Sequence, residues 1–406
     1  MKILLVHRYI RPDTPGYAHM LYIMGQRFAS EGHDVTIFSA QPSYNDAYDG
    51  PPLPRKQQVD GMRIIRTPLL KEKKKSALLR SINFLIFGLS LFFHAVFRRK
   101  AYDLMTVTTF PPTVMGWVAR VIGRFRETKY VYHCMDLYPE VALTSGILKR
   151  KWLTNFAASV DRRNCKKAIA TIVLSNDMLD TVQARGLSCD NAYVINNFII
   201  DTVNDNVTIP QAFTNSQNKF RVLFAGNIGR FQSLDTIVAA AHRLKDNREI
   251  EFWLVGSGVM VEVLKQQAGE LLDQTVFFHP YLPIETVMMV IAQSHLGIVS
   301  LSPGVIKCAY PSKTMSYLEA GCKLLVLVEE DTDLARFVTE EKIGVVASKP
   351  EPMAVAAAIE TEFQQWKQSD YDRNTIAETG RSHFSQRVIL DRWIELLNEI
   401  ESRISN

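Results

Sequence analysis

The sequence has few cysteines, and their spacing offers neither a metal site nor a disulfide framework. Five cysteines are scattered over 406 residues without a Cys-x-x-Cys pair. This usage fits a reducing compartment. The opening MKILLVHR is too short an apolar run for a secretory signal and is typical of a first buried strand. We therefore expect a cytoplasmic protein.

The sequence also lacks an uninterrupted apolar run of membrane-spanning length. The nearest candidate is the segment Lys71 to Lys100, whose apolar middle, Ile82 to Phe93, is shorter than the roughly 20 residues that a spanning helix needs. Its leucines and phenylalanines fall roughly on one helical face, and basic clusters flank both ends. That composition is typical of a helix lying in a membrane interface beside anionic lipid. A buried helix with charged ends is the alternative.

Acidic residues are scarce in the first half of the chain. Residues 1–200 hold 28 lysines and arginines against 15 aspartates and glutamates, whereas residues 201–406 hold 19 against 27. A basic half suggests nucleic acid or an anionic membrane as its neighbour. Given the segment at 71–100, we expect peripheral contact with the inner membrane and no nucleic acid.

Two successive series of predicted strands and helices are present, separated by a polar, aperiodic stretch at 198–218. The length suits two domains of about 200 residues each. We predict an α/β protein with one domain over residues 1–200 and a second over residues 201–384. A final helix over residues 385–406 is expected to pack back on the first domain.

The stretch YPSKTMSYLEAG, residues 310–321, is predicted to be a loop that leads into a helix. Ser312 is expected to cap the helix, and Lys313 would lie in its first turn, where free N–H groups attract anions. Ser316 and Glu319 continue a polar stripe from Ser312. A nucleoside diphosphate would suit this arrangement. The alternative is an ordinary βα unit whose polar face meets water.

Glycine turns follow other predicted strands. Gly16 lies in the first such loop, Gly226-Asn227-Ile228-Gly229-Arg230 follows the first strand of the second half, and Gly256 and Tyr281 follow the next two. Ligands of parallel α/β folds bind at the carboxyl ends of strands, so these turns are predicted to border a cleft. For Gly16, a simple turn glycine is the alternative.

The motif DLYPE places a carboxylate, Asp136, just beyond a predicted strand. His133 lies three residues earlier, so the two side chains would point to opposite faces of a regular strand. We favour Asp136 as the residue facing the cleft. For His133 the alternative is a packed strand residue.

Six motifs together resemble a known family. They are EGHDV (31–35), DLYPE (136–140), INNF (195–198), AGNIGRFQSLD (225–235), LVGSG (254–258) and YPSK…YLEAG (310–321). In order and spacing they resemble the GT-B retaining glycosyltransferases of family 4, in the branch of WbuB-like polysaccharide enzymes. The resemblance implies two facing Rossmann-like domains, with a nucleotide-sugar donor, such as a UDP-sugar, bound mainly by the second. It implies a polyprenyl-diphosphate-linked or other membrane glycan as the acceptor on the first, in surface polysaccharide synthesis.

The resemblance also implies residue roles. Lys313 and Arg230 would stabilise the leaving diphosphate, and Asp136 would orient the acceptor hydroxyl, with His133 and Glu140 nearby. The donor would contact Gly16, Asn227, Gly229, Gly256, Tyr281, Ser312, Ser316 and Glu319. Because cations and N–H groups can neutralise the diphosphate, we expect no metal and no other cofactor.

This sequence departs from the family pattern at the donor site. The arginine and lysine that usually grip the diphosphate are replaced by Asn227 and Gln232. The ribose-binding glutamate corresponds to Ser316, with Glu319 one turn further on as the alternative ribose ligand. The second motif carboxylate corresponds to Pro311, and the paired glycines of the first loop to Pro15-Gly16. Two alternatives therefore stand beside a hexosyl- or N-acetylhexosaminyltransferase: a nucleotide-sugar epimerase of the same architecture, and a non-catalytic nucleotide-binding module.

Overall fold

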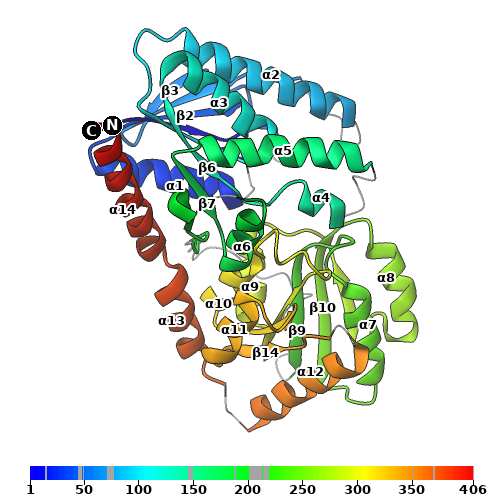
Figure 1. The fold of residues 1–406 in the computed structure, drawn as a ribbon. Helices are drawn as coiled ribbons and strands as arrows, with labels where there is room; N and C mark the ends of the chain where they lie inside the picture. The colour runs from blue at the N-terminus through cyan, green and yellow to red at the C-terminus, as the bar shows by residue number, and fades with distance from the viewer. Residues whose placement is uncertain are drawn as a thin grey trace. The chain divides into compact units, whose positions relative to one another are not determined.

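The computed structural model describes the chain except for residues 14–15, 44–47, 49, 71–76, 145–149, 187–188, 201–212, 214–218, 350, 369–370 and 406. The chain divides into two compact units, Met1–Ile200 with Ile389–Asn406, and Asp201–Val388 (Figure 1). Pro15, the basic run at 71–76 and most of the predicted linker at 198–218 lie outside the described residues.

The first unit contains a sheet of eight strands in the order β3-β4-β2-β1-β5-β6-β7-β8. All neighbours are parallel except β3 and β4. Strand β5 is buried at every residue, as expected for a parallel strand covered on both faces. The strands are β1 (Lys2–Val6), β2 (Asp34–Ala40), β3 (Lys56–Val59), β4 (Met62–Thr67), β5 (Leu104–Thr108), β6 (Lys129–His133), β7 (Ala170–Val173) and β8 (Ala192–Val194).

Seven α-helices in the described part of the chain belong mainly to this unit. They are α1 (Gly16–Ser30), α2 (Ala77–Val96), α3 (Val114–Arg126), α4 (Glu140–Thr144), α5 (Lys151–Lys167), α6 (Asn176–Ala184) and α14 (Gln386–Ser405). Helix α3 packs between α2 and α5 (Figure 1). The last helix, α14, buries Trp393 and Leu397 in the core of the first unit, where the Trp393 ring lies 6.2 Å from Phe28. The predicted return of the final helix to the first domain is confirmed.

The second unit contains a six-stranded parallel sheet in the order β11-β10-β9-β12-β13-β14. Its strands are β9 (Phe220–Asn227), β10 (Ile250–Ser257), β11 (Val276–His279), β12 (Leu296–Ser300), β13 (Lys323–Leu327) and β14 (Gly344–Val346). Its helices are α7 (Leu234–Arg243), α8 (Val261–Ala268), α9 (Ile284–Ala292), α10 (Lys313–Glu319), α11 (Asp333–Glu340), α12 (Pro352–Lys367) and α13 (Arg373–Phe384). The predicted α/β class with two Rossmann-like domains is confirmed.

Helix α2 is longer than the sequence predicted. The expected apolar middle covered Ile82 to Phe93, but by length and composition the stretch Leu78–Val96 is long and apolar enough to cross a membrane. The polar residues Asn83 and His94 both lie inside one continuous helix and do not interrupt it. Length alone therefore does not decide how this helix is used.

The packing of α2 shows that one of its sides belongs to the core of the first unit. Phe87 is fully buried, and its ring lies 5.5 Å from that of Phe38 in β2. The side chain of Asn83 is also buried, where it donates to the carbonyl of Leu70 at 2.8 Å and accepts from its N–H at 2.9 Å. The opposite side stays exposed, as Leu85 shows with 62% of its surface accessible.

Candidate active site

Lys313 lies where the sequence predicted a cation, at the start of α10. Its ammonium lies 4.8 Å from the centre of the Phe224 ring in β9, a cation–π contact. Among the described residues, no carboxylate forms an ion pair with it. Burial lowers the pKa of Lys313 to about 8. A desolvated cation without a counter-ion is a favourable binding partner for an anionic group.

Glycines at the ends of β9 and β10 make room for this lysine. Gly226 has a φ of +137°, and a Cβ there would lie 2.8 Å from Cε of Lys313. At Gly256, with a φ of +145°, a Cβ would lie 1.8 Å from the carbonyl oxygen of Gly226. Both positions therefore require glycine. Gly256 was predicted to contact the donor, whereas no role was predicted for Gly226, although it lies against the lysine.

Tyr317 anchors α10 to the sheet and was missed by the sequence analysis. Its hydroxyl accepts a hydrogen bond from the N–H of Ala225 at 2.9 Å and donates to the carbonyl of Leu223 at 3.4 Å. The ring fits because residue 297 is glycine; a Cβ there would lie 2.5 Å from the ring. The only feature of the sequence that pointed to this contact was a tyrosine within the predicted helix, next to its apolar side.

The polar stripe of α10 differs from the prediction in two respects. Ser312 has helical backbone angles and makes no side-chain cap, so the predicted cap is wrong; the N–H of Thr314 bonds to the carbonyl of Pro311 instead. Glu319 forms an ion pair with Arg381 of α13 at 3.3 Å. Its predicted contact with the donor, like that of the partly buried Ser316, stays a prediction.

The turn after β9 is held by its own backbone and by neighbouring strand ends. The side chain of Gln232 accepts from the N–H of Gly229 at 3.0 Å, and Ile228 donates to the carbonyl of Ser257 at 2.9 Å. Asn227 and Arg230 are both exposed. Arg230 is thus available to an anion but is not fixed in place as Lys313 is.

Tyr281 lies beyond the edge strand β11, and β10 separates that strand from β9. Its side chain is 60% exposed. No described contact joins it to Lys313, so the structure does not bring this predicted residue together with the others.

Asp136 lies just past the end of β6, as predicted. Its N–H donates to Oγ1 of Thr109, which follows the neighbouring strand β5, at 3.3 Å. Among the described residues, no cation forms an ion pair with its carboxylate. Burial raises the pKa of Asp136 to about 6, which places it near neutrality and makes it a candidate proton acceptor.

His133 is a packed strand residue. Its Nδ1 lies 3.0 Å from the Tyr17 hydroxyl, and its ring lies 5.2 Å from that of Trp393 in α14. Burial lowers its pKa to about 3, so the imidazole is neutral. The structure therefore places His133 in the core between helices. Gly16 begins α1, and a Cβ there would meet only Ile200 at 3.9 Å.

Glu140 belongs to a buried ion-pair network. Nε of Arg185 donates to Glu140 at 2.8 Å, and Nη1 donates to Asp161 at 2.7 Å. Asp161 also accepts from the Tyr132 hydroxyl at 2.7 Å. Glu140 begins α4 four residues after Asp136, so the network fixes the start of that helix.

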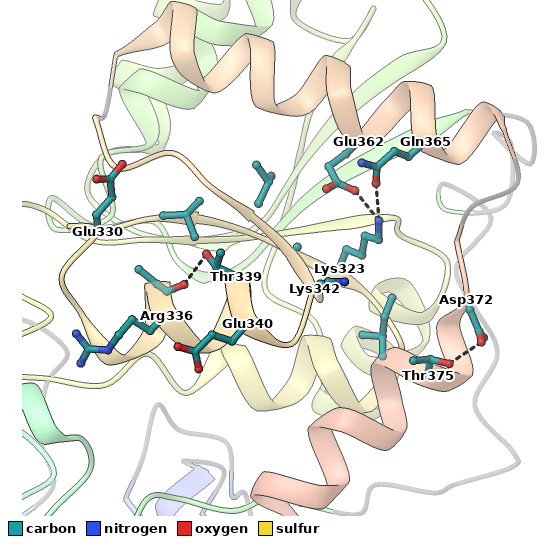
Figure 2. Close-up of a pocket in the computed structure, with 15 residues that line it drawn as sticks. Lys323, Glu330, Arg336, Thr339, Glu340, Lys342, Glu362, Gln365, Asp372 and Thr375 are labelled. Atoms are coloured by element: carbon teal, nitrogen blue, oxygen red, sulfur yellow. Dashed lines mark hydrogen bonds and ion pairs between the residues drawn. The ribbon is translucent and has the colours of Figure 1, made fainter.

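A cavity of about 880 Å³ opens beside β13 and β14 and includes none of the predicted site residues. Figure 2 shows Glu362 and Gln365 both directed at Lys323, whose ammonium they bind at 2.9 and 2.8 Å. Because the buried cation of this cavity is already neutralised, it is a weaker anion site than Lys313.

The described residues contain no group of three or more histidine, cysteine, aspartate or glutamate side chains that could hold a metal ion. The sequence does contain two Asp-x-Asp triplets, at 331–333 and 370–372. Asp333 pairs with Arg336 at 2.6 Å, and Asp372 caps α13 by accepting from the N–H of Asn374 at 2.9 Å. These two carboxylates therefore have structural partners.

Comparison with curated proteins gives two distant relatives. The chain is 23% identical over 380 residues to WcaI of Escherichia coli K12, named as a colanic acid biosynthesis glycosyl transferase; the match covers 88% of this chain and 90% of WcaI. It is 24% identical over 245 residues to WbjE of Pseudomonas aeruginosa, named as a glycosyltransferase, covering 57% of this chain and 59% of WbjE.

Solved structures share the fold over nearly the whole chain. Sucrose-phosphate synthase from Thermosynechococcus elongatus matches with a TM-score of 0.74 and 15% identity, covering 99% of this chain and all of that one. HepE from Anabaena, solved in complex with UDP, matches with a TM-score of 0.69 and 16% identity, covering 98% of this chain and all of HepE.

Two family models divide the chain much as the structure does. The glycosyl transferase 4-like domain matches residues 16–197, within the first unit, and the glycosyl transferases group 1 model matches residues 219–364, within the second. The sequence motifs, the two Rossmann-like units and these matches agree, and the chain belongs to the GT-B glycosyltransferases, consistent with family 4.

Proposed function

We propose that this glycosyltransferase moves a sugar from a nucleoside diphosphate donor, a UDP-sugar, to a lipid-linked saccharide at an anionic membrane. The reaction would retain the anomeric configuration and serve the assembly of a surface polysaccharide. The names of WcaI and WbjE support the class of product, and the family resemblance supports retention. The observation that carries the proposal is the ammonium of Lys313 at the start of α10, which forms no ion pair with any carboxylate among the described residues.

The donor half of the proposal rests on charge. As the sugar departs, negative charge grows on the leaving diphosphate and must be neutralised. Lys313 is placed against Gly226 with no described carboxylate nearby, and the exposed Arg230 can add a second cation. HepE bound to UDP supports a uridine nucleotide as the ligand. These cations would allow leaving-group stabilisation without a metal.

The acceptor half rests on Asp136. A carboxyl group with a pKa of about 6 is ionised at neutral pH and can accept a hydrogen bond from the acceptor hydroxyl. The hydroxyl oxygen would then form the new bond to the anomeric carbon while the bond from that carbon to the diphosphate breaks. The hydroxyl proton passes to the leaving diphosphate or to Asp136. We assign no protein nucleophile.

The membrane contact rests on the exposed side of α2. Leu85, Leu89 and Phe93 project from it, and α3 adds Trp117 and Phe125 on the same face of the sheet. Neither α2 nor α3 contains an aspartate or glutamate. An apolar face without acidic residues suits the interface of an anionic bilayer, with the protein bound peripherally on the cytoplasmic side.

Incubation with labelled UDP-sugars tests the function. Together with a lipid extract that contains the acceptor, the protein should release UDP and transfer label to lipid with retained configuration. With donor alone it should give only slow hydrolysis. Formation of a new sugar epimer from donor alone would show that the protein is an epimerase and not a transferase. Binding of UDP with no turnover of any donor would favour a nucleotide-binding module.

A further inference from the structure

A second cavity, of about 480 Å³, lies in the first unit between the last turns of α2 and the hairpin β3-β4. Its lining contains three cations and two phenylalanines but no carboxylate: Lys56, Arg63, Ile65, Phe93, His94, Phe97 and Arg98. None of the motifs discussed above includes the hairpin residues.

The charges around this cavity are unbalanced. Lys56 pairs with Ile65 across the hairpin and Arg63 with Gln58, which directs the two cations to the same face of the hairpin. Among the described residues, no carboxylate forms an ion pair with Lys56, Arg63 or Arg98. The same three cations all act to lower the pKa of His94, which burial chiefly depresses to about 4. The cavity therefore has a positive potential.

The outer rim of the cavity is aromatic. The rings of Phe93 and Phe97 are stacked, with centroids 5.8 Å apart and planes 21° apart. Both are exposed, at 55% and 75% of their surface. They continue the exposed side of α2 by one turn. Cations inside and exposed aromatic rings outside match an amphiphile whose charged end enters first.

We propose that this cavity binds the phosphate-bearing headgroup of an anionic lipid, while Phe93 and Phe97 contact its acyl region. This inference rests on the proposed membrane contact of α2 and goes beyond it, because diffuse attraction needs no particular set of cations. Free phosphate shares the headgroup chemistry but would not use the two rings.

Vesicle co-sedimentation of the full chain tests the site. The vesicles contain phosphatidylcholine alone or mixed with phosphatidylglycerol. The variant Lys56→Gln/Arg63→Gln is compared with Arg80→Gln/Arg124→Gln, which removes two exposed charges of α2 and α3 outside the cavity. Charge-assisted hydrogen bonds predict that the cavity pair lowers affinity for the anionic vesicles at least about tenfold more than the control pair.

Further variants and probes separate the alternatives. Phe97→Ser should weaken vesicle binding without changing its salt dependence, since no charge is removed. Equal losses for the cavity pair and the control pair would overturn the site in favour of diffuse attraction. Stabilisation by inorganic phosphate that depends on Lys56 and Arg63, without vesicle binding, would overturn the lipid as the source.

The proposed function can fail separately from this inference. If the wild-type chain binds no anionic vesicles, both the headgroup site and the α2 contact fall, whatever its affinity for UDP. If it binds vesicles as expected but does not bind UDP, the donor site falls and the headgroup site stands. UDP binding is therefore measured on the same preparations.

Discussion

The two units differ in the charge of one partly buried group for which no ion-pair partner is found among the described residues. One group lies three residues after strand β6 of a mainly parallel sheet, and the other begins helix α10 beside a fully parallel sheet. In the first unit it is Asp136, whose pKa burial raises to about 6; in the second it is Lys313, whose pKa burial lowers to about 8. The same fold therefore offers a proton acceptor in one unit and an anion binder in the other. In the proposed reaction the acceptor hydroxyl uses the first, and the leaving diphosphate uses the second.

Removing the carboxylate of the first unit should have the largest effect. Asp136→Asn keeps the side-chain shape but cannot accept a proton, so we expect kcat to fall about 10²- to 10⁴-fold. UDP affinity should not change, because the donor site is proposed to lie in the second unit. Steady-state kinetics and UDP titration measure the two effects. A variant with normal kcat would show that Asp136 is not used.

The same variant should be more stable at neutral pH. Because burial raises the folded pKa of Asp136 from 3.8 to about 6, its contribution to stability is fully present only below about pH 4. That contribution is lost as the pH rises through about 6. Asp136→Asn should therefore raise the free energy of unfolding by about 1–2 kcal/mol at pH 7, with no gain at pH 3.5.

The two pKa shifts together predict the pH dependence of the wild-type enzyme. Asp136 must be deprotonated, which requires a pH above about 6, and Lys313 must be protonated, which requires a pH below about 8. A plot of kcat/KM should therefore be bell-shaped, falling about tenfold per pH unit on either side. Asp136→Asn should abolish the acid limb and leave the alkaline limb. A profile without an alkaline limb would show that activity does not depend on protonated Lys313.

A methyl group at Gly226 should displace the side chain of Lys313. Gly226→Ala places a Cβ 2.8 Å from Cε of Lys313, so the flexible end of the lysine must move. We expect UDP affinity to fall about three- to tenfold, a cost of roughly 1 kcal/mol. Gly269→Ala is the control, because Gly269 also has a positive φ but open space around it. Equal losses in both variants would assign the effect to backbone strain.

The smallest effect is expected at Glu319. If its carboxylate binds ribose, Glu319→Gln should weaken UDP about threefold and leave binding of inorganic diphosphate unchanged. Arg381→Met removes the ion-pair partner but keeps the carboxylate. That variant should bind UDP normally. If its UDP affinity falls as much as that of Glu319→Gln, the ion pair supports the structure and Glu319 does not contact the ribose. Isothermal titration calorimetry distinguishes these outcomes.

The architecture could be predicted from sequence because it follows from short-range patterns: unalternating apolar runs predicted the parallel strands. Position after a strand singled out Asp136, and the start of a helix singled out Lys313; the roles of both residues stay predictions. The contacts of Gly226 and Tyr317 could not be predicted, because they depend on which loops and helices meet across the sheet. The cap by Ser312 failed because the backbone of Pro311 already accepts the available hydrogen bond.

The sequence of α2 also could not show which of its sides is buried and which is exposed. Its sequence indicated an interfacial or a buried helix, and the structure divides these roles between its sides, with Phe87 in the core and Leu85 exposed. The Arg185 network was equally hidden, because Glu140, Asp161 and Arg185 are separated along the chain and meet only in the folded unit. Long-range pairing of charges leaves no periodic signal.

The central claim is that Lys313 binds the diphosphate of the donor. The most direct measurement is the ratio of affinities for UDP and uridine in the wild-type chain and in Lys313→Met, at a pH well below 8. The account predicts that the wild-type protein strongly prefers UDP and that Lys313→Met loses about 10- to 100-fold of this preference while binding uridine as before. An unchanged ratio would contradict it.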